Sequence, residues 1–252
     1  MLKARKLEVV LGGNQIVSGV DMEVRAGQLI GILGPSGSGK STLLRAMSGF
    51  RPATKGVVTF EGSDLYEEFE SLKRRIGFVP QDDVVPRALK VGRALGYTAE
   101  LRLADRSREQ KEARVHRVLR TLGLYGHRDK RVSKLSGGQR KRVSVGMELI
   151  AEPRLIFADE PTSGLDPALE RSLTQTFREL ASGDRAVVVT THIMSSLDVL
   201  DRVCVLNKGK RCYFGPVDEL KSFFEVDDFT RIYDRLQSAS VDHWQKKQRR
   251  RA

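Results

Sequence analysis

Four short segments of the chain combine residue types that bind phosphate or activate water. In chain order they are GPSGSGKST at residues 34–42, LSGGQ at residues 135–139, LIFADE at residues 155–160, and a histidine, His192, that follows the apolar run 186–191. The first two are glycine-rich loops, and the third ends in two adjacent acids. Such a set provides anion donors, a metal-binding carboxylate and a general base. The pattern is typical of a protein that closes over a nucleoside triphosphate.

The first segment fits the pattern G-x-x-x-x-G-K-[ST] and follows an apolar run, residues 29–33, that reads as a strand. Glycines let successive backbone N–H groups turn toward phosphate oxygens, which a side chain would obstruct. The helix expected over residues 41–48 points its N-terminal dipole at the anion, while Lys40 reaches the β- and γ-phosphates and the Ser41 hydroxyl meets Mg²⁺. The predicted phosphate-binding residues are Gly34, Pro35, Ser36, Gly37, Ser38, Gly39, Lys40, Ser41 and Thr42. A glycine- and serine-rich turn is the alternative, and the loop alone does not separate kinases, GTPases and transport ATPases.

The third segment begins that separation, because residues 155–158 form a short apolar strand that ends in Asp159 and Glu160. In phosphate-loop folds the first acid belongs to the Mg²⁺ shell, and the second can polarise a water for attack on the γ-phosphorus. Two acids before Pro161 can also simply end a strand and start a turn. Together with the phosphate-binding loop, they favour a hydrolase over a kinase.

The LSGGQ segment is a second glycine-rich loop, and it opens a helix-like run over residues 139–150. A second phosphate-binding helix N-terminus in one chain is best explained as serving the nucleotide of a neighbouring subunit. With these motifs the chain resembles the nucleotide-binding domain of ABC transporters over about residues 7–224. The resemblance implies ATP and Mg²⁺ as cofactors and a dimer with a second copy or a homologous ATPase domain. It implies that the residues facing the neighbour's nucleotide are Ser136, Gly137, Gly138 and Gln139.

The same resemblance assigns roles to three further residues. Gln81 follows the expected strand 76–79 and is implied to contact Mg²⁺ and the attacking water and to report to a membrane partner. Asp166 ends the SGLD segment that crosses the dimer interface in the family, although an Asp before Pro167 is also a good helix N-cap. His192 is implied to contact the γ-phosphate.

The resemblance implies two sets of site residues. The implied catalytic residues are Lys40, Gln81, Glu160 and His192, and the implied metal-binding residues are Ser41, Gln81 and Asp159. A lone histidine is usually structural, and we interpret His116, His127 and His243 in that way.

Longer stretches resemble one subfamily, the G subfamily with its White-type exporters and bacterial relatives. These stretches are VPQDDVV at 79–85, YTAELRL at 97–103, LSGGQRKRVSVGMEL at 135–149 and DEPTSGLDP at 159–167. In that group the ATPase precedes its membrane domain, whereas the apolar runs here are far shorter than the ~18 residues of a spanning helix. The permease is therefore expected on a separate chain or on the rest of a longer polypeptide. The expected location is the cytoplasmic face of the cell membrane, through that permease.

A second class of function keeps the ATPase and replaces the membrane with a macromolecule. Some ABC-type ATPases act as clamps on ribosomes or DNA, but the ribosomal kind normally carries two cassettes and the DNA-repair kind is split by a long coiled coil. Neither pattern occurs in this chain. Recognition-helix and zinc-finger patterns are also absent from the sequence, so we expect no nucleic-acid partner.

Composition is compatible with one substantial core and a smaller lobe, since 40% of the 252 residues are hydrophobic. Cys204 and Cys212 lie in apolar strand-like runs and are more simply read as reduced core thiols than as a disulfide or a metal pair. The net charge is +12, and part of it is concentrated in the C-terminal residues Lys246, Lys247, Arg249, Arg250 and Arg251. A basic tail of this kind is either a solvated, disordered end or a surface for anionic lipid headgroups.

The alternation of strands and helices predicts an α/β fold of the P-loop NTPase type. We expect a mainly parallel sheet, an antiparallel β layer from strands near residues 7–10, 16–24 and 57–60, and an inserted α-helical subdomain at about residues 82–150. The ATPase domain is predicted over residues 1–224 and a charged linker or tail over 225–252.

Base recognition departs from the family pattern, because residues 1–33 contain no Phe, Tyr or Trp. Many ABC domains stack an aromatic side chain on adenine in this region, and here Val10 or Leu11 occupies the expected position.

Overall fold

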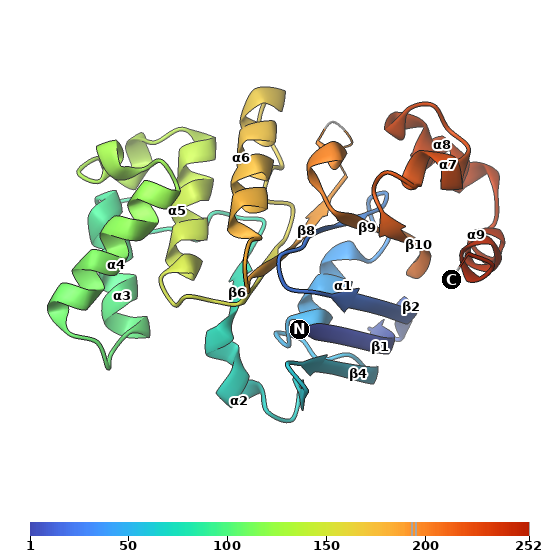
Figure 1. Cartoon of the computed structure of the whole chain (residues 1–252), viewed down its shortest axis with the longest axis horizontal. Helices are drawn as coiled ribbons and strands as arrows, with labels where there is room; N and C mark the ends of the chain where they lie inside the picture. Colours follow the sequence, from blue (N-terminus) through green and yellow to red (C-terminus); the bar gives the residue numbers. More distant parts are fainter. Residues whose placement is uncertain (193, 195, 252) are drawn as a thin grey trace.

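The computed structural model describes residues 1–192, 194 and 196–251, so Ala252, the last residue of the expected tail, lies outside the described residues. Its largest sheet has the strand order β10-β9-β3-β8-β7-β6, in which all neighbours are parallel except β9 and β10 (Figure 1). The strands are β3 (Leu29–Leu33), β6 (Ile76–Val79), β7 (Leu155–Ala158), β8 (Ala186–Thr191), β9 (Arg202–Asn207) and β10 (Lys210–Pro216). Because the parallel strands share a direction, the loops after β3, β7 and β8 meet at one edge of the sheet.

The second sheet is antiparallel and has the order β2-β1-β4-β5. Its strands are β1 (Leu2–Leu11), β2 (Asn14–Val24), β4 (Lys55–Phe60) and β5 (Ser63–Asp64). The short helix α2 (Phe69–Leu72) connects it to β6. Strand β2 also contacts β10, so the antiparallel layer adjoins the edge of the parallel sheet.

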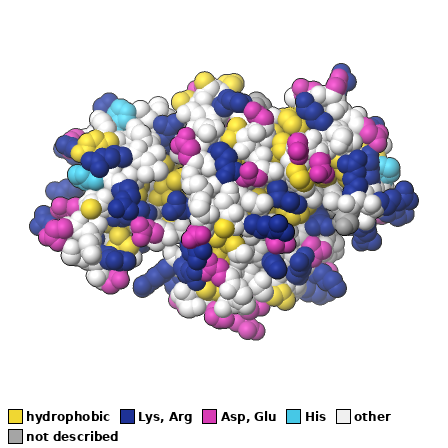
Figure 2. All heavy atoms as spheres, in the orientation of Figure 1, with side chains coloured by type: hydrophobic (Ala, Val, Ile, Leu, Met, Phe, Trp, Pro, Cys, Tyr) yellow, Lys and Arg dark blue, Asp and Glu magenta, His cyan; other side chains and the backbone are white. Residues whose placement is uncertain are grey.

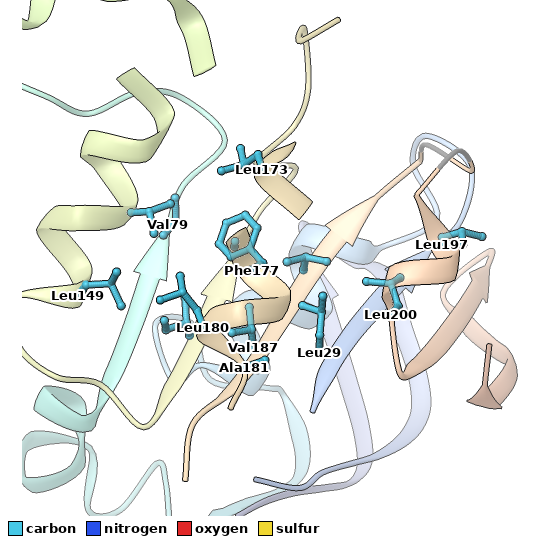
Figure 3. Packing of buried hydrophobic residues seen from close by; sticks show 14 of the residues in the cluster. Leu29, Val79, Leu149, Leu173, Phe177, Leu180, Ala181, Val187, Leu197 and Leu200 are labelled. Atoms are coloured by element: carbon cyan, nitrogen blue, oxygen red, sulfur yellow. The ribbon is translucent and has the colours of Figure 1, made fainter. Parts of the chain in front are cut away.

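Buried side chains on the parallel strands alternate between two apolar clusters. On β8, Ala186 and Val188 belong to the cluster that α1 (Lys40–Met47) and the antiparallel sheet cover, while Val187 and Val189 face the other cluster. Figure 3 shows side chains of α6 (Pro167–Leu180), among them Phe177, gathered in this second cluster together with Val187. Strands buried on both faces explain the continuous apolar runs of the sequence.

Three α-helices separate β6 from β7, and no strand lies between β6 and β7 in that fully described part of the chain. They are α3 (Val91–Arg102), α4 (Arg108–Thr121) and α5 (Gly137–Leu149). They gather at the left of the molecule in Figure 1. The predicted fold class is thereby confirmed: a mainly parallel sheet, an antiparallel layer and an inserted helical subdomain.

The C-terminal segment differs from the expected linker or disordered end. After α7 (Leu220–Phe224) the chain forms two further helices, α8 (Ile232–Ser238) and α9 (Val241–Arg249). Trp244 of α9 is only 1% exposed and packs against Phe224, with the ring centroids 4.9 Å apart. These helices pack because their apolar side chains Ile232, Leu236 and Trp244 belong to the same buried cluster as Phe177. Figure 2 shows basic side chains gathered at this end of the molecule, with acidic side chains among them.

Two other expectations concern burial and length. Cys204 and Cys212 are buried and free, as read from their apolar runs, and burial raises the pKa of both thiols to about 12. Among the described residues, no helix is long and apolar enough to cross a membrane.

Candidate active site

The phosphate-binding loop runs from β3 to α1 and needs glycine at two tight positions. Gly34 has φ +155°, and a Cβ there would lie 2.4 Å from the carbonyl oxygen of Leu206. Gly39 has φ +96°, and its Cβ would lie 2.8 Å from the carbonyl oxygen of Ile16. The loop is therefore packed against β9 on one side and β2 on the other, and the approach of backbone to backbone excludes any side chain at these positions.

Helix α1 begins directly after this loop, and its first turn has neither an acidic residue nor a side-chain cap. The N–H groups of a first helical turn have no partner within the helix, and the helix dipole adds positive potential there. The Ser38 hydroxyl is also buried and lacks a hydrogen-bond partner among the described residues. An anion at this end of α1 would satisfy both sets of donors.

Lys40 is only 6% exposed and folds back over its own loop. Its ammonium donates to the carbonyl of Gly34 at 2.9 Å and to that of Pro35 at 3.2 Å, and it lies 3.7 Å from the carboxylate of Glu160. Burial lowers the pKa of Lys40, while the negative charges of Glu160 and Asp159 raise it. The ammonium is thus held at the site by carbonyls that it can exchange for phosphate oxygens.

Ser41, Asp159 and Thr190 form one hydrogen-bonded group across three elements. The hydroxyls of Ser41 and Thr190 donate to the same oxygen of Asp159, at 2.7 Å and 2.8 Å. The other Asp159 oxygen is buried and has no hydrogen-bond partner among the described residues, although the Arg45 guanidinium lies 3.7 Å away. A hydroxyl beside a carboxylate oxygen that lacks a donor fits Mg²⁺, which commonly takes one or two protein ligands together with substrate phosphates.

The described residues contain no cluster of three or more His, Cys, Asp or Glu side chains that would hold a metal alone. The residues present therefore fit a cation shared with a nucleotide better than a closed protein cage.

Glu160 occupies a strained position at the centre of the site. Its φ is +41°, in the left-handed region that a non-glycine residue rarely adopts, and its N–H donates to the Thr190 hydroxyl at 2.7 Å. Its carboxylate lies between Lys40 and His192, whose Nδ1 is 3.4 Å from Oε2. Strain of this kind persists only where surrounding contacts hold it, and it is common at catalytic residues.

Two predicted site regions lie apart from this group. Gln81 is exposed, and its backbone carbonyl accepts from the Lys141 ammonium at 2.7 Å. Among the described residues, no hydrogen bond or ion pair joins residues 136–139 to residues 34–42. In Figure 1, α5 lies to the left of α6 and α1 lies to its right.

The LSGGQ loop, residues 135–139, instead caps its own helix, α5. Ser136 accepts from the N–H of Gln139 at 3.3 Å, and the Gln139 side chain accepts from the N–H of Ser136 at 3.1 Å. This is a capping box, and its S-x-x-Q pattern is readable from the sequence. Asp166 likewise caps α6, accepting from the N–H groups of Ala168 and Leu169 at 3.1 and 3.0 Å.

Sequence reasoning missed four residues that contact the predicted ones. Thr190 joins Asp159 to Glu160, and the buried Lys141 joins α5 to the backbone at Gln81. The other two are His127, 3.0 Å from the Gln139 amide, and Tyr233, whose hydroxyl reaches the carbonyls of Gly34 and His192. Only Thr190 carries a sequence signal, since it lies near the end of the strand that leads to His192.

Comparison with known families agrees with this geometry. A family model described as ABC transporter matches residues 17–163, which is more than half of the chain. The chain belongs to the ABC transporter family. A model of an AAA domain also matches, over residues 147–198 only.

Curated relatives of this ABC protein include transporters from bacteria and plants. It is 48% identical over 224 residues to the ABC transporter ATP-binding/permease protein Rv1747 of Mycobacterium tuberculosis and 39% identical over 226 residues to ABC transporter G family member 14 of Arabidopsis thaliana. These alignments cover 88% and 85% of this chain but 26% and 34% of the relatives, so the chain spans about a third or less of their length. It is 32% identical to the Nod factor export ATP-binding protein I of Cupriavidus metallidurans, with 87% and 72% of the two chains covered.

Solved structures of ABC ATPases have the same fold. The match to cbiO1 of Clostridium perfringens, part of the ABC transporter complex cbiONQ, has a TM-score of 0.80 at 26% identity and covers 97% and 98% of the two chains. The match to the ATP-binding cassette MJ0796, a dimer in a post-hydrolysis state with ADP and Pi, has a TM-score of 0.75 at 26% identity and covers 86% and 99%. The chain is therefore an ABC ATPase, as its motifs predict.

Proposed function

We propose that this chain is the ATP-hydrolysing domain of an ABC exporter, working as a pair with a second copy or a homologous domain. The observation that carries the proposal is the cluster at one edge of the parallel sheet, where Ser41 and Asp159 share a hydrogen bond and Glu160 lies between Lys40 and His192. Two ATP molecules lie head to tail between the partners. Closure over them is the step that performs work on the permease.

Each bound ATP contacts two different subunits in this arrangement. Residues 34–42 of one subunit hold the phosphates, and Ser136, Gly137, Gly138 and Gln139 of the other face the γ-phosphate, with Asp166 at the interface. Support comes from the open first turn of α1 and from the separation of α5 from α1 within one chain. The dimer described for MJ0796 is consistent with it.

The metal-binding residues of the proposal are Ser41, Asp159 and Gln81. Mg²⁺ supplies positive charge that offsets the charge developing on the transferred phosphoryl oxygens. The Asp159 carboxylate is already held by the hydroxyls of Ser41 and Thr190, whereas Gln81 must approach from an exposed loop.

Hydrolysis then depends on the carboxylate of Glu160, which accepts a proton from the attacking water. Lys40 binds the β- and γ-phosphates and leaves the Glu160 carboxylate free to act as a base. His192 lies on the other side of that carboxylate and contacts the γ-phosphate. Release of phosphate reopens the pair.

The membrane partner is a permease domain or subunit, which places the chain at the cytoplasmic face of the membrane. The names of the relatives support this, since they include an ATP-binding/permease protein and an export ATP-binding protein. The basic residues of α9 and those that follow it add attraction to anionic lipid headgroups. The alternative of a clamp on a macromolecule finds no support in the names of these relatives.

Mixing two inactive variants tests the two-subunit site. Lys40→Ala removes phosphate charge, and Gly137→Asp places a carboxylate against the partner's γ-phosphate, so each protein alone is expected to be inactive. A mixed dimer contains one intact site. With random exchange in an equal mixture, half of the dimers are mixed and each has one of two sites, so about a quarter of wild-type ATPase activity is expected.

Formation of mixed dimers is checked by native mass spectrometry with differently sized tags. Mixed dimers that hydrolyse no ATP, under conditions where the wild type is active, would contradict a site that works independently.

A further inference from the structure

Helix α8, near the C-terminus, places a side chain in the active site that belongs to none of the sequence motifs. The hydroxyl of Tyr233 lies 3.2 Å from the carbonyl oxygen of His192 and 3.4 Å from that of Gly34. One carbonyl belongs to His192, which is proposed to contact the γ-phosphate, and the other belongs to Gly34, the first glycine of the phosphate-binding loop. Tyr233 therefore bridges two catalytic segments that come from different strands of the parallel sheet.

The position of this hydroxyl is set by the packing of α8. Ile232 and Leu236, on either side of Tyr233 in the helix, are buried in the main apolar cluster. The Asn207 side chain donates to the carbonyl of Leu236 at 3.2 Å, and the Arg235 guanidinium donates to the carbonyl of Phe224 at 3.0 Å. The tyrosine thus extends from a docked helix rather than from a free chain end.

The two carbonyls do not depend on Tyr233 equally. A tyrosine hydroxyl has a single proton to donate, and the Gly34 carbonyl already accepts from the Lys40 ammonium at 2.9 Å. The shorter of the two hydroxyl contacts is the one to His192. Burial raises the pKa of Tyr233 to about 12, with the charge of Glu160 adding to the effect, so the hydroxyl keeps its proton at neutral pH.

We propose that Tyr233 is a positioning residue for ATP hydrolysis, which holds the backbone of His192 beside Glu160 and joins it to the phosphate-binding loop. This rests on the proposed role of His192. When Lys40 turns from the Gly34 carbonyl to the phosphates, the Tyr233 hydroxyl remains as a donor within reach of that carbonyl. The helix that follows the recognised motifs is thereby part of the catalytic unit.

The effect of losing this hydroxyl should fall on the rate of the reaction more than on nucleotide binding. Tyr233 contacts two backbone carbonyls, while the phosphate contacts of Lys40 and the first turn of α1 do not require it. In Tyr233→Phe, we expect kcat for ATP to fall about fivefold, as for the loss of one ordinary hydrogen bond, with KM changed less than about twofold.

Tyr213→Phe is the matched control, because the Tyr213 hydroxyl also donates to a carbonyl, that of Pro216 at 2.7 Å, within β10. Its kcat is expected to equal that of the wild type. The fluorescence of Trp244, the single tryptophan, reports in both variants whether α9 stays packed against Phe224. A fall in kcat in both variants, or no fall in Tyr233→Phe with unchanged Trp244 fluorescence, overturns the proposal.

The variant His192→Ala and the double variant separate this inference from the one on which it rests. If Tyr233 acts through His192, adding Tyr233→Phe to His192→Ala lowers kcat no further. A fivefold loss that persists in the His192→Ala background shows that the hydroxyl does not act through His192 and overturns the proposed positioning of that histidine. Full ATPase activity of His192→Ala alone would instead overturn the proposed function of the histidine.

Discussion

The two glycine-rich loops of this chain both open a helix, yet they satisfy the first turn of that helix in opposite ways. The first turn of α1 has no side-chain cap, and the buried Ser38 hydroxyl beside it lacks a partner among the described residues. The first turn of α5 is closed by the reciprocal bonds of Ser136 and Gln139. One loop is open to a ligand of its own chain, while the other is complete as a helix end.

This difference explains how one chain can present two unlike halves of a site. The capping bond uses Ser136 as an acceptor, so its hydroxyl proton stays available to donate to a phosphate of a partner's nucleotide. The cap therefore orients Ser136 before a partner arrives. Around α1, in contrast, the ligand itself must supply the missing acceptors.

The largest expected effect lies in the half that hydrolyses ATP. Glu160→Gln keeps the size of the side chain but removes the base, so ATP turnover should fall about 10²- to 10⁴-fold, as is typical when a general base is lost. ATP should also trap the dimer, which size-exclusion chromatography would detect. Turnover equal to that of the wild type would remove Glu160 from the mechanism and leave the strained φ without a catalytic explanation.

The second effect concerns the link between the two halves. The ammonium of Lys141, on α5, lies 2.9 Å from the Asp83 carboxylate and donates to the carbonyl of Gln81. Lys141→Met leaves that carboxylate with Arg140 at 3.8 Å, so the loss of stability should lie near or below the lower end of the about 3–5 kcal/mol seen for broken buried pairs.

Chemical denaturation measures this loss. The double variant with Asp83→Asn should recover part of it, because the side chain that has lost Lys141 is then neutral. A double variant that is no more stable than Lys141→Met would show that the ion pair is not the link.

The third effect concerns nucleotide selectivity. It tests whether the phosphate contacts dominate nucleotide binding while the nucleobase is held weakly. With Val10 half exposed on β1 and no aromatic residue before residue 34, we expect GTP to be hydrolysed within about tenfold of ATP, or ~1.4 kcal/mol. Leu11→Tyr or Val10→Tyr should tighten ATP binding, since stacking on a base is worth about 1–3 kcal/mol. Titration of the protein with both nucleotides measures this selectivity. An ATP preference of about a hundredfold would show that another residue recognises adenine.

The smallest effect separates the two functions of Ser136, as a helix cap and as a phosphate-binding residue. Ser136→Ala removes a helix cap and should cost about 1 kcal/mol of stability. Ser107→Ala removes the matching capping box of α4, in which Gln110 is the partner, and should cost a similar amount. Thermal unfolding compares the two, and only Ser136→Ala should also lower ATPase activity. Equal activity of both variants would mean that Ser136 is a cap alone.

Much of this contrast is readable from the sequence. The alternating runs predict the strands of the parallel sheet, and GPSGSGKST places α1 within one residue of its observed start. The S-x-x-Q pattern at Ser136 is also local, so the sequence alone is enough to predict the capping box there. The segment after residue 225 was not predicted, because basic residues mask the few apolar positions that dock α8 and α9.

The sequence by itself determined the chemistry of the phosphate-binding loop, since the spacing of glycines, Lys40 and Ser41 is dictated by the shape of a phosphate chain. It also determined the fold class, since periodicity is a local property. Only the tertiary structure decided that Thr190 joins Asp159 to Glu160, that Lys141 is buried against the loop at Gln81, and that Tyr233 reaches His192. A hydroxyl or an ammonium has many possible partners along a chain, and the partner that it meets depends on how distant elements pack.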